Sequence, residues 1–209
     1  STFLVTGPRS RDLLMALSGD DFGNNAFPWL GHKSVTVAGV KMTALRVSFT
    51  GEMGWELHLP VAETEAVHAV LRADGQEFNL KPFGMLALDS MRLEKGYRSW
   101  KGDLTSDYNL FDCGLGRWVH LSKEEFVGRN ALAALKDKRH RQFVTLAVDD
   151  AAADVNCGEA VYLSSVFSDN KGQKIVGLVL SGGYGHRTST SLAFAVLEGG
   201  QDASIGREV

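Results

Sequence analysis

The sequence has little of what marks several large classes of protein. Among 209 residues it has only two cysteines, four prolines and six histidines, and no apolar run is long enough to cross a bilayer. Cys113 and Cys157 form no Cys-x-x-Cys pair and have no histidine at ligand spacing, so we expect two reduced thiols and no metal site. The first residues lack a signal-peptide pattern. These absences predict a cytoplasmic protein, or an organellar one if a targeting segment precedes Ser1.

The sequence also has little excess of either positive or negative charge. The net charge is −3, the two signs are interspersed, and the single basic cluster is the short run at 136–141. This distribution argues against a nucleic-acid-binding surface. Hydrophobic residues make up 44% of the chain and charged residues 22%, which is enough apolar material for one large domain or two modest ones.

The first two thirds of the chain predict an antiparallel sheet with packed helices, an α+β fold. We expect a strand at 3–5, a helix after Pro8, an antiparallel meander over 34–60, and helices over 61–72 and 83–95. In the meander, Leu45, Val47 and Phe49 are expected to share one face of the second strand. In the last helix, Met85, Leu88 and Met91 are expected on the apolar side.

The pattern of apolar and polar residues changes near Lys138. Short apolar pieces separated by glycine, aspartate, asparagine and serine predict a small all-β, barrel-like domain over 139–209, after an α+β domain over 1–138. The chain begins without methionine and stops in a strand-like pattern. We therefore expect the N-terminal part of the first domain to be missing and the second domain to be truncated.

The segment 49–57 is the most informative. Gly51 and Gly54 predict a tight, exposed turn, and the alternation that follows places Glu56 on the face opposite Trp55. A carboxylate beside a turn can accept two hydrogen bonds from the donor edge of a flat heterocycle. Alternation alone more often places a glutamate in solvent, so the pattern by itself favours a solvent-facing side chain.

Asp89 and Arg92 lie three residues apart and share a face of a predicted helix, so the carboxylate can orient the guanidinium toward an anionic ligand. Spacing alone favours the simpler reading, a surface ion pair worth about 0.3 to 0.5 kcal/mol. Trp100, in the polar loop that follows, can stack on a flat ring. Aromatic residues near loops more often cover the core.

Other stretches do not match known catalytic motifs. Gly114-x-Gly116 lacks the third glycine of a dinucleotide fingerprint, and 181–187 lacks the Lys-Ser/Thr pair of a phosphate loop. There is no Gly-x-Ser-x-Gly elbow and no His-Glu-x-x-His spacing. The sequence therefore argues against Rossmann, P-loop, zinc and serine-hydrolase chemistry.

Several motifs, in the same order, resemble the aminomethyltransferase family, which includes the T-protein of the glycine cleavage system. They are Gly7-Pro8, Phe49-Thr50-Gly51-Glu52-x-Gly-Trp-Glu56, Leu88-Asp89-x-x-Arg92-Leu93-Glu94 and Gly114-Leu115-Gly116. The segments 92–100, 103–108 and 125–129 look more like the folate-binding C-terminal region of dimethylglycine and sarcosine dehydrogenases. The resemblance implies that the part before about Lys138 binds folate and that the rest forms a β-barrel-like domain.

The resemblance also implies roles for four side chains. Glu56 is expected to hydrogen-bond the pterin ring of tetrahydrofolate, and Arg92 to contact the folate or shape its cavity. Phe49 and Trp100 stand where the family pattern has tyrosines, so a flat ring is kept and a phenol is lost. The family's acidic residue near the folate nitrogen belongs to an earlier segment, so no catalytic residue is assigned in this chain.

The resulting hypothesis is an aminomethyltransferase-like enzyme that transfers a one-carbon unit from an amine donor to tetrahydrofolate. Two alternatives stay open: a folate-binding module of a flavin-dependent dimethylglycine or sarcosine dehydrogenase, and a non-catalytic folate-binding regulator. The expected partners are folate, a small amine or methyl donor, and a flavin dehydrogenase domain or a lipoyl carrier protein. Neither nucleic acid nor a membrane is expected.

Overall fold

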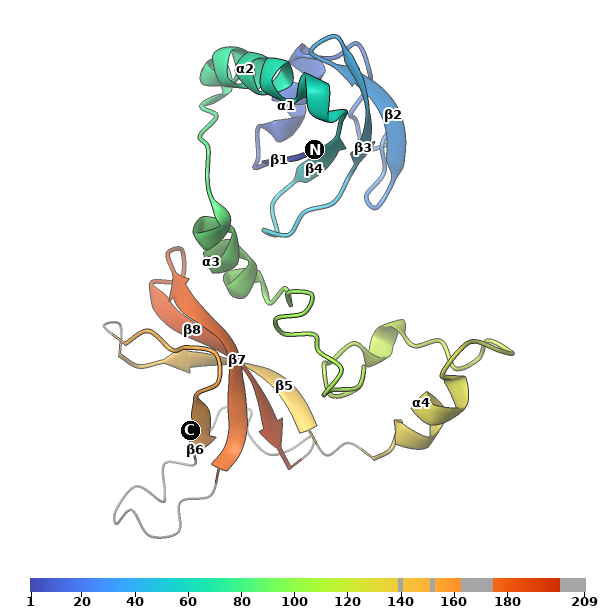
Figure 1. Ribbon diagram of the computed structural model, residues 1–209, viewed down its shortest axis with the longest axis vertical. Helices are drawn as coiled ribbons and strands as arrows, with labels where there is room; N and C mark the ends of the chain where they lie inside the picture. The colour runs from blue at the N-terminus through green and yellow to red at the C-terminus, as the bar shows by residue number, and fades with distance from the viewer. Residues whose placement is uncertain (139–140, 151–152, 163–174, 200–209) are drawn as a thin grey trace. The chain divides into compact units, whose positions relative to one another are not determined.

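The computed structural model describes residues 1–138, 141–150, 153–162 and 175–199. The chain divides into two compact units, Ser1–Lys95 and Gly96–Val209 (Figure 1). Each unit contains its own antiparallel sheet; the first sheet is packed by helices, and the second belongs to a small barrel-like domain. The α+β fold class predicted from the sequence is confirmed.

The sheet of the first unit has the strand order β1-β4-β3-β2. Its strands are β1 (Thr2–Thr6), β2 (His32–Val37), β3 (Val40–Leu45) and β4 (Gly54–His58). All neighbours are antiparallel, and β2 and β3 are joined by a tight turn in which Ala38 and Gly39 have φ of 52° and 77°. β4 lies between β1 and β3, so within the described residues β1 is an edge strand with a neighbour on one side only.

The second strand of the meander is shorter than the sequence predicts. β3 ends at Leu45, and both Val47 and Phe49 lie outside the sheet. The amide N–H of Arg46 still donates to the carbonyl of Gly31 (2.9 Å), in register with the β2–β3 pairing. The amide N–H of Val47 then donates to the carbonyl of Leu45 (3.0 Å), and this tight turn directs the chain away from the sheet. The prediction that Phe49 shares a strand face was therefore wrong, and a turn carries its side chain.

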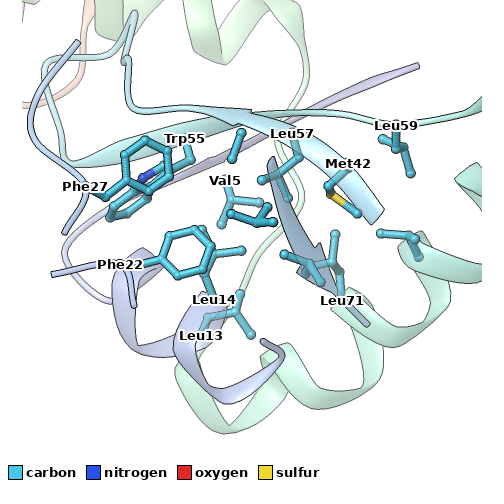
Figure 2. Packing of buried hydrophobic residues seen from close by; sticks show 14 residues of the cluster. Val5, Leu13, Leu14, Phe22, Phe27, Met42, Trp55, Leu57, Leu59 and Leu71 are labelled. Atoms are coloured by element: carbon cyan, nitrogen blue, oxygen red, sulfur yellow. The ribbon is translucent and has the colours of Figure 1, made fainter. Parts of the chain in front are cut away.

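Helices α1 (Ser10–Ala16) and α2 (Thr64–Asp74) contribute to a core on one face of this sheet (Figure 2). Trp55 on β4 is fully buried, and the rings of Phe22 and Phe27 lie edge-on to it, with centroid distances of 5.5 and 6.2 Å. Leu57 is buried in the same core. Because successive strand residues point to opposite faces, the burial of Trp55 and Leu57 places Glu56 on the other face.

The remaining helical elements of the first unit are η1 (Val61–Glu63), η2 (Gly75–Phe78) and α3 (Met85–Lys95). The helix predicted over 83–95 is present as α3, and Gly96 follows it with φ of 76°. The prediction of its apolar side was wrong for Met85, which is 70% exposed, whereas Leu88 and Met91 are half-buried and Arg92 is only 4% exposed. Helical periodicity shows which residues share a face, but it does not show which face is covered.

The second unit contains η3 (Gly116–Trp118), α4 (Arg129–Leu135), β5 (Arg141–Val148), β6 (Ala160–Tyr162), β7 (Ile175–Gly185) and β8 (Thr190–Glu198). Its sheet has the order β5-β8-β7-β6. β8 is buried at every position from 191 to 197, as expected for a strand between two neighbours. The glycine-rich stretch lies within β7, where a Cβ at Gly182 would collide with the carbonyl of Val155. The strand-like pattern at the end of the sequence, over 204–209, lies outside the described residues.

Candidate functional site

The open face of the first sheet, opposite the core, carries Glu56 in a central position. The cross-strand partners of Glu56 are Leu4 on β1 and Leu45 on β3, and both leucines are half-buried. Directly opposite residues on antiparallel strands have Cβ atoms about 4.5–5.5 Å apart. A carboxylate therefore lies between two aliphatic side chains on this face.

The Glu56 carboxylate has one protein partner and remains accessible. Its Oε2 lies 3.1 Å from His58 Nε2, and its side chain is 38% exposed. His58 is held in turn from the other side, since its Nδ1 lies 3.2 Å from Thr2 Oγ1. Within the described part of the chain, the other carboxylate oxygen forms no hydrogen bond. A carboxylate accepts about four hydrogen bonds, so Glu56 can still bind a donor edge.

Hydroxyl groups fix the turn that carries Phe49. Thr50 Oγ1 lies 3.1 Å from Thr6 Oγ1 and 3.1 Å from Ser48 Oγ, so both neighbours of Phe49 belong to one hydroxyl cluster. Close packing at this point requires Gly54, because a Cβ there would lie 2.9 Å from Thr6 Oγ1. These hydrogen bonds hold the turn, which includes the half-buried residue Phe49, against the end of β1.

Arg92 is not part of a surface ion pair. Its Nε donates to Asp89 Oδ1 (2.9 Å), but its side chain is only 4% exposed, whereas that of Asp89 is 49% exposed. The same helix meets the turn that carries Phe49, since a Cβ at Gly51 (φ 79°) would lie 2.5 Å from Lys95 Cδ. The structure therefore brings the helix of Arg92 next to the turn of Phe49. Arg92 is a buried cation with a fixed orientation.

Trp100 belongs to the second unit and is 78% exposed. The tight turn that carries it is organised by Asp103, which is fully buried. Asp103 Oδ2 accepts the amide N–H of Ser99 (2.7 Å), and Oδ1 accepts the hydroxyl of Ser181 on β7 (2.6 Å). Sequence reasoning gave Asp103 no role. A serine four residues before an aspartate is compatible with a local turn, but nothing in the sequence points to Ser181.

The two cysteines lie in different surroundings, and Cys113 is close to charged side chains of the second unit. This thiol is buried, and burial followed by the nearby Asp112 raises its pKa, against an opposing effect of Arg98. Arg98 lies over the ring of Phe143, with its guanidinium carbon 4.3 Å from the centroid. Cys157, in contrast, is exposed.

We expect the two thiols to react at very different rates. A raised pKa leaves less thiolate at neutral pH, and the thiolate is the reactive form, so Cys157 should be modified at least about tenfold faster than Cys113. Iodoacetamide labelling followed by peptide mass mapping measures both rates. The fast reaction should disappear in Cys157→Ser and persist in Cys113→Ser; equal rates for the two thiols would contradict the burial of Cys113.

Two further observations limit the chemistry of the described residues. They contain no cluster of three or more His, Cys, Asp or Glu side chains able to hold a metal ion. None of the helices in this described part is both long and apolar enough to span a bilayer.

Comparisons with known proteins can now be set beside this geometry. A family model described as the GCVT N-terminal domain matches residues 1–123, and one described as the glycine cleavage T-protein C-terminal barrel domain matches residues 141–209. Human mitochondrial dimethylglycine dehydrogenase is 34% identical over 98% of this chain and 23% of its own length. An aminomethyltransferase of Saccharopolyspora erythraea is 35% identical over 71% of this chain and 41% of its own.

Among solved structures, the crystal structure of glycine cleavage system aminomethyltransferase T from Bartonella henselae matches with a TM-score of 0.74 and 26% identity. The match covers 92% of this chain and 50% of that one. The chain thus spans between about a quarter and a half of these three relatives. The predicted domain boundary near Lys138 stays a prediction. Since the first family model alone matches more than half of the residues, this chain belongs to the aminomethyltransferase family of the glycine cleavage T-protein.

Proposed function

We propose that this chain binds tetrahydrofolate on the open face of its first sheet and takes part in transferring a one-carbon unit from an amine donor to it. The observation that carries the proposal is the placement of Glu56: an accessible carboxylate, with acceptor capacity to spare, between Leu4 and Leu45. Family membership supports tetrahydrofolate as the ligand, and the roles of single residues are part of the proposal.

The residues present suit the chemistry of a pterin. Its amino-pyrimidine edge offers adjacent N–H donors, and Glu56 offers acceptors that the protein does not use up. Leu4 and Leu45 provide apolar contact for a flat ring, and Phe49 provides an aromatic one. Bound in this way, tetrahydrofolate supplies the nitrogen that receives the carbon unit. The chain orients that ring and keeps water away from the reacting carbon.

Arg92 contributes a permanent positive charge in this unit. A buried guanidinium is costly unless its donors are paired, and Asp89 pairs one of them. We assign to Arg92 either a direct contact with the folate or the shaping of its cavity. Ring packing by Trp100, which lies in the second unit, stays a prediction from the sequence.

A second candidate function is favoured by one observation. Human mitochondrial dimethylglycine dehydrogenase matches 98% of this chain but is about four times longer, since the match covers 23% of it. In that reading the chain is a folate-binding module of a larger flavin-dependent dehydrogenase, and its folate receives the carbon released by oxidation of a methylated amine. The name of this relative also raises a mitochondrial location beside the cytoplasmic one.

Two experiments in parallel test the proposal. Isothermal calorimetry should show saturable binding of tetrahydrofolate to the 209-residue chain. A turnover assay on the full-length protein, with tetrahydrofolate and dimethylglycine, sarcosine or an aminomethyl donor, should show formation of methylene-tetrahydrofolate. Binding without turnover would favour a non-catalytic folate-binding regulator. The proposal would be refuted if calorimetry showed no binding of tetrahydrofolate either to the 209-residue chain or to the full-length protein.

A further inference from the structure

The free edge of β1 presents unpaired backbone groups. Ser1 and Leu59 exchange two backbone hydrogen bonds (2.9 and 3.0 Å), and the amide N–H of Gly7 donates to the carbonyl of Met53 (2.8 Å). In an antiparallel pair, hydrogen-bonded positions alternate, so the odd-numbered residues of β1 bond to β4 and the even-numbered ones point outward. In the described part of the chain, no other strand pairs with the outward N–H and C=O groups of Thr2, Leu4 and Thr6.

A hollow of about 720 Å³ lies along this edge. Its lining includes β1, part of α2 and the segment 78–85, and it does not include Glu56, Phe49 or Arg92. Most of the lining is apolar, with the rings of Phe3, Phe78 and Phe83 and the side chains of Leu71, Leu80 and Met85. Phe83 and Met85 are 41% and 70% exposed. Exposed apolar side chains around a hollow are typical of an interaction surface.

The charge of this hollow is of one sign. Its lining contains Arg9, Arg72 and Lys81 and no carboxylate, although the chain as a whole has a net charge of −3. The guanidinium of Arg9 is fixed, because it lies over the ring of Phe78 (5.0 Å) and donates to the carbonyl of Glu77 (3.1 Å). Any partner that enters the hollow therefore meets cations at its rim.

The geometry points to a docking site for an extended polypeptide strand that carries both apolar and acidic side chains. Such a strand adds to the sheet by pairing with the outward backbone groups of Thr2, Leu4 and Thr6. Every second side chain then points to the core side of the sheet, into the apolar hollow, because Phe3 and Val5 of β1 point the same way. Carboxylates on the same strand pair with Arg9, Arg72 and Lys81.

Charge distinguishes this partner from a second copy of the chain. Pairing two β1 edges would bring two sets of the same three cations together, and like charges at close range disfavour an interface. An acidic strand removes this repulsion. Of the residues that line the hollow, the folate-binding proposal uses the side chain of Leu4 alone, whereas the docking proposal uses its backbone groups. None of the three cations enters the folate-binding proposal, so the two can fail independently.

The test uses the whole 15N-labelled chain and two end-blocked peptides of alternating residues, one of glutamate and valine, the other of lysine and valine. The glutamate peptide should bind saturably and slow amide hydrogen exchange at Thr2, Leu4 and Thr6. It should bind at least about tenfold more tightly than the lysine peptide. Leu4→Pro should abolish the binding, because it removes an outward N–H while leaving the bonds to β4 in place.

A charge-reversal variant is the matched control. In Arg72→Glu/Lys81→Glu both changes are at exposed positions, and the preference should reverse toward the lysine peptide. The proposal is overturned if the glutamate peptide gives no exchange protection at millimolar concentration, or if both peptides bind equally. It is also overturned if the chain alone dimerises and protects these amides without peptide, which would identify a second copy as the occupant.

Discussion

Replacement of Glu56 by alanine should weaken tetrahydrofolate binding at least about 30-fold, because hydrogen bonds to a charged group contribute about 1.5–3 kcal/mol each. The carboxylate lies on the open face of the sheet, so its removal leaves no buried group unpaired and the fold should be unaffected. Calorimetry with tetrahydrofolate measures the loss, and circular dichroism verifies that the variant is folded.

The matched control is Glu65→Ala. Glu65 is an exposed glutamate on α2, the helix that packs on the opposite, core-bearing face of the same sheet. It has the same charge and side-chain length as Glu56 and should leave the affinity unchanged. Equal affinities for Glu56→Ala and the unaltered chain would remove Glu56 from the binding site.

Asp103→Ala should lower the free energy of unfolding by about 2–5 kcal/mol. The substitution removes both acceptors from a fully buried site and leaves the Ser99 amide and the Ser181 hydroxyl without partners. The Trp100 turn and β7 lose their connection at the same time. Urea denaturation of the whole chain, followed by fluorescence and circular dichroism, measures the change.

Two variants separate this effect from simple loss of charge. Asp103→Asn keeps an oxygen for the Ser99 amide and turns its NH₂ toward the Ser181 hydroxyl, which can accept, so the loss should be about 1 kcal/mol. Asp107→Ala removes an exposed carboxylate from the same segment and should stay within about 0.5 kcal/mol of the unaltered chain. A loss for Asp107→Ala as large as that for Asp103→Ala would contradict the account.

The placement of Glu56 was predictable because it follows from a local rule. Strand alternation separates it from Trp55 whatever the rest of the chain does, and the structure shows Trp55 buried and Glu56 on the other face. Phe49 was placed on a strand because its segment also alternates. What ends that strand is a tight turn in which the amide N–H of Val47 donates to the carbonyl of Leu45 (3.0 Å), and the alternation of the segment does not predict this turn.

Arg92 and Asp103 show a second limit of prediction from sequence patterns. Helical spacing predicted the bond between Arg92 and Asp89, but exposure depends on what covers the helix, which the spacing does not contain. Asp103 depends on Ser181, which is 78 residues away along the chain. Contacts of this kind arise from tertiary packing, so a single sequence does not reveal them.

The central claim is that the Glu56 carboxylate accepts hydrogen bonds from the amino-pyrimidine edge of the pterin. A double-mutant cycle tests it directly, by combining Glu56→Gln with a tetrahydrofolate analogue that lacks the 2-amino group. The account predicts that each change alone weakens binding and that the second adds little to the first, which gives a coupling energy of at least about 1 kcal/mol. Losses that add to within about 0.3–0.5 kcal/mol would show that Glu56 and the pterin edge do not meet.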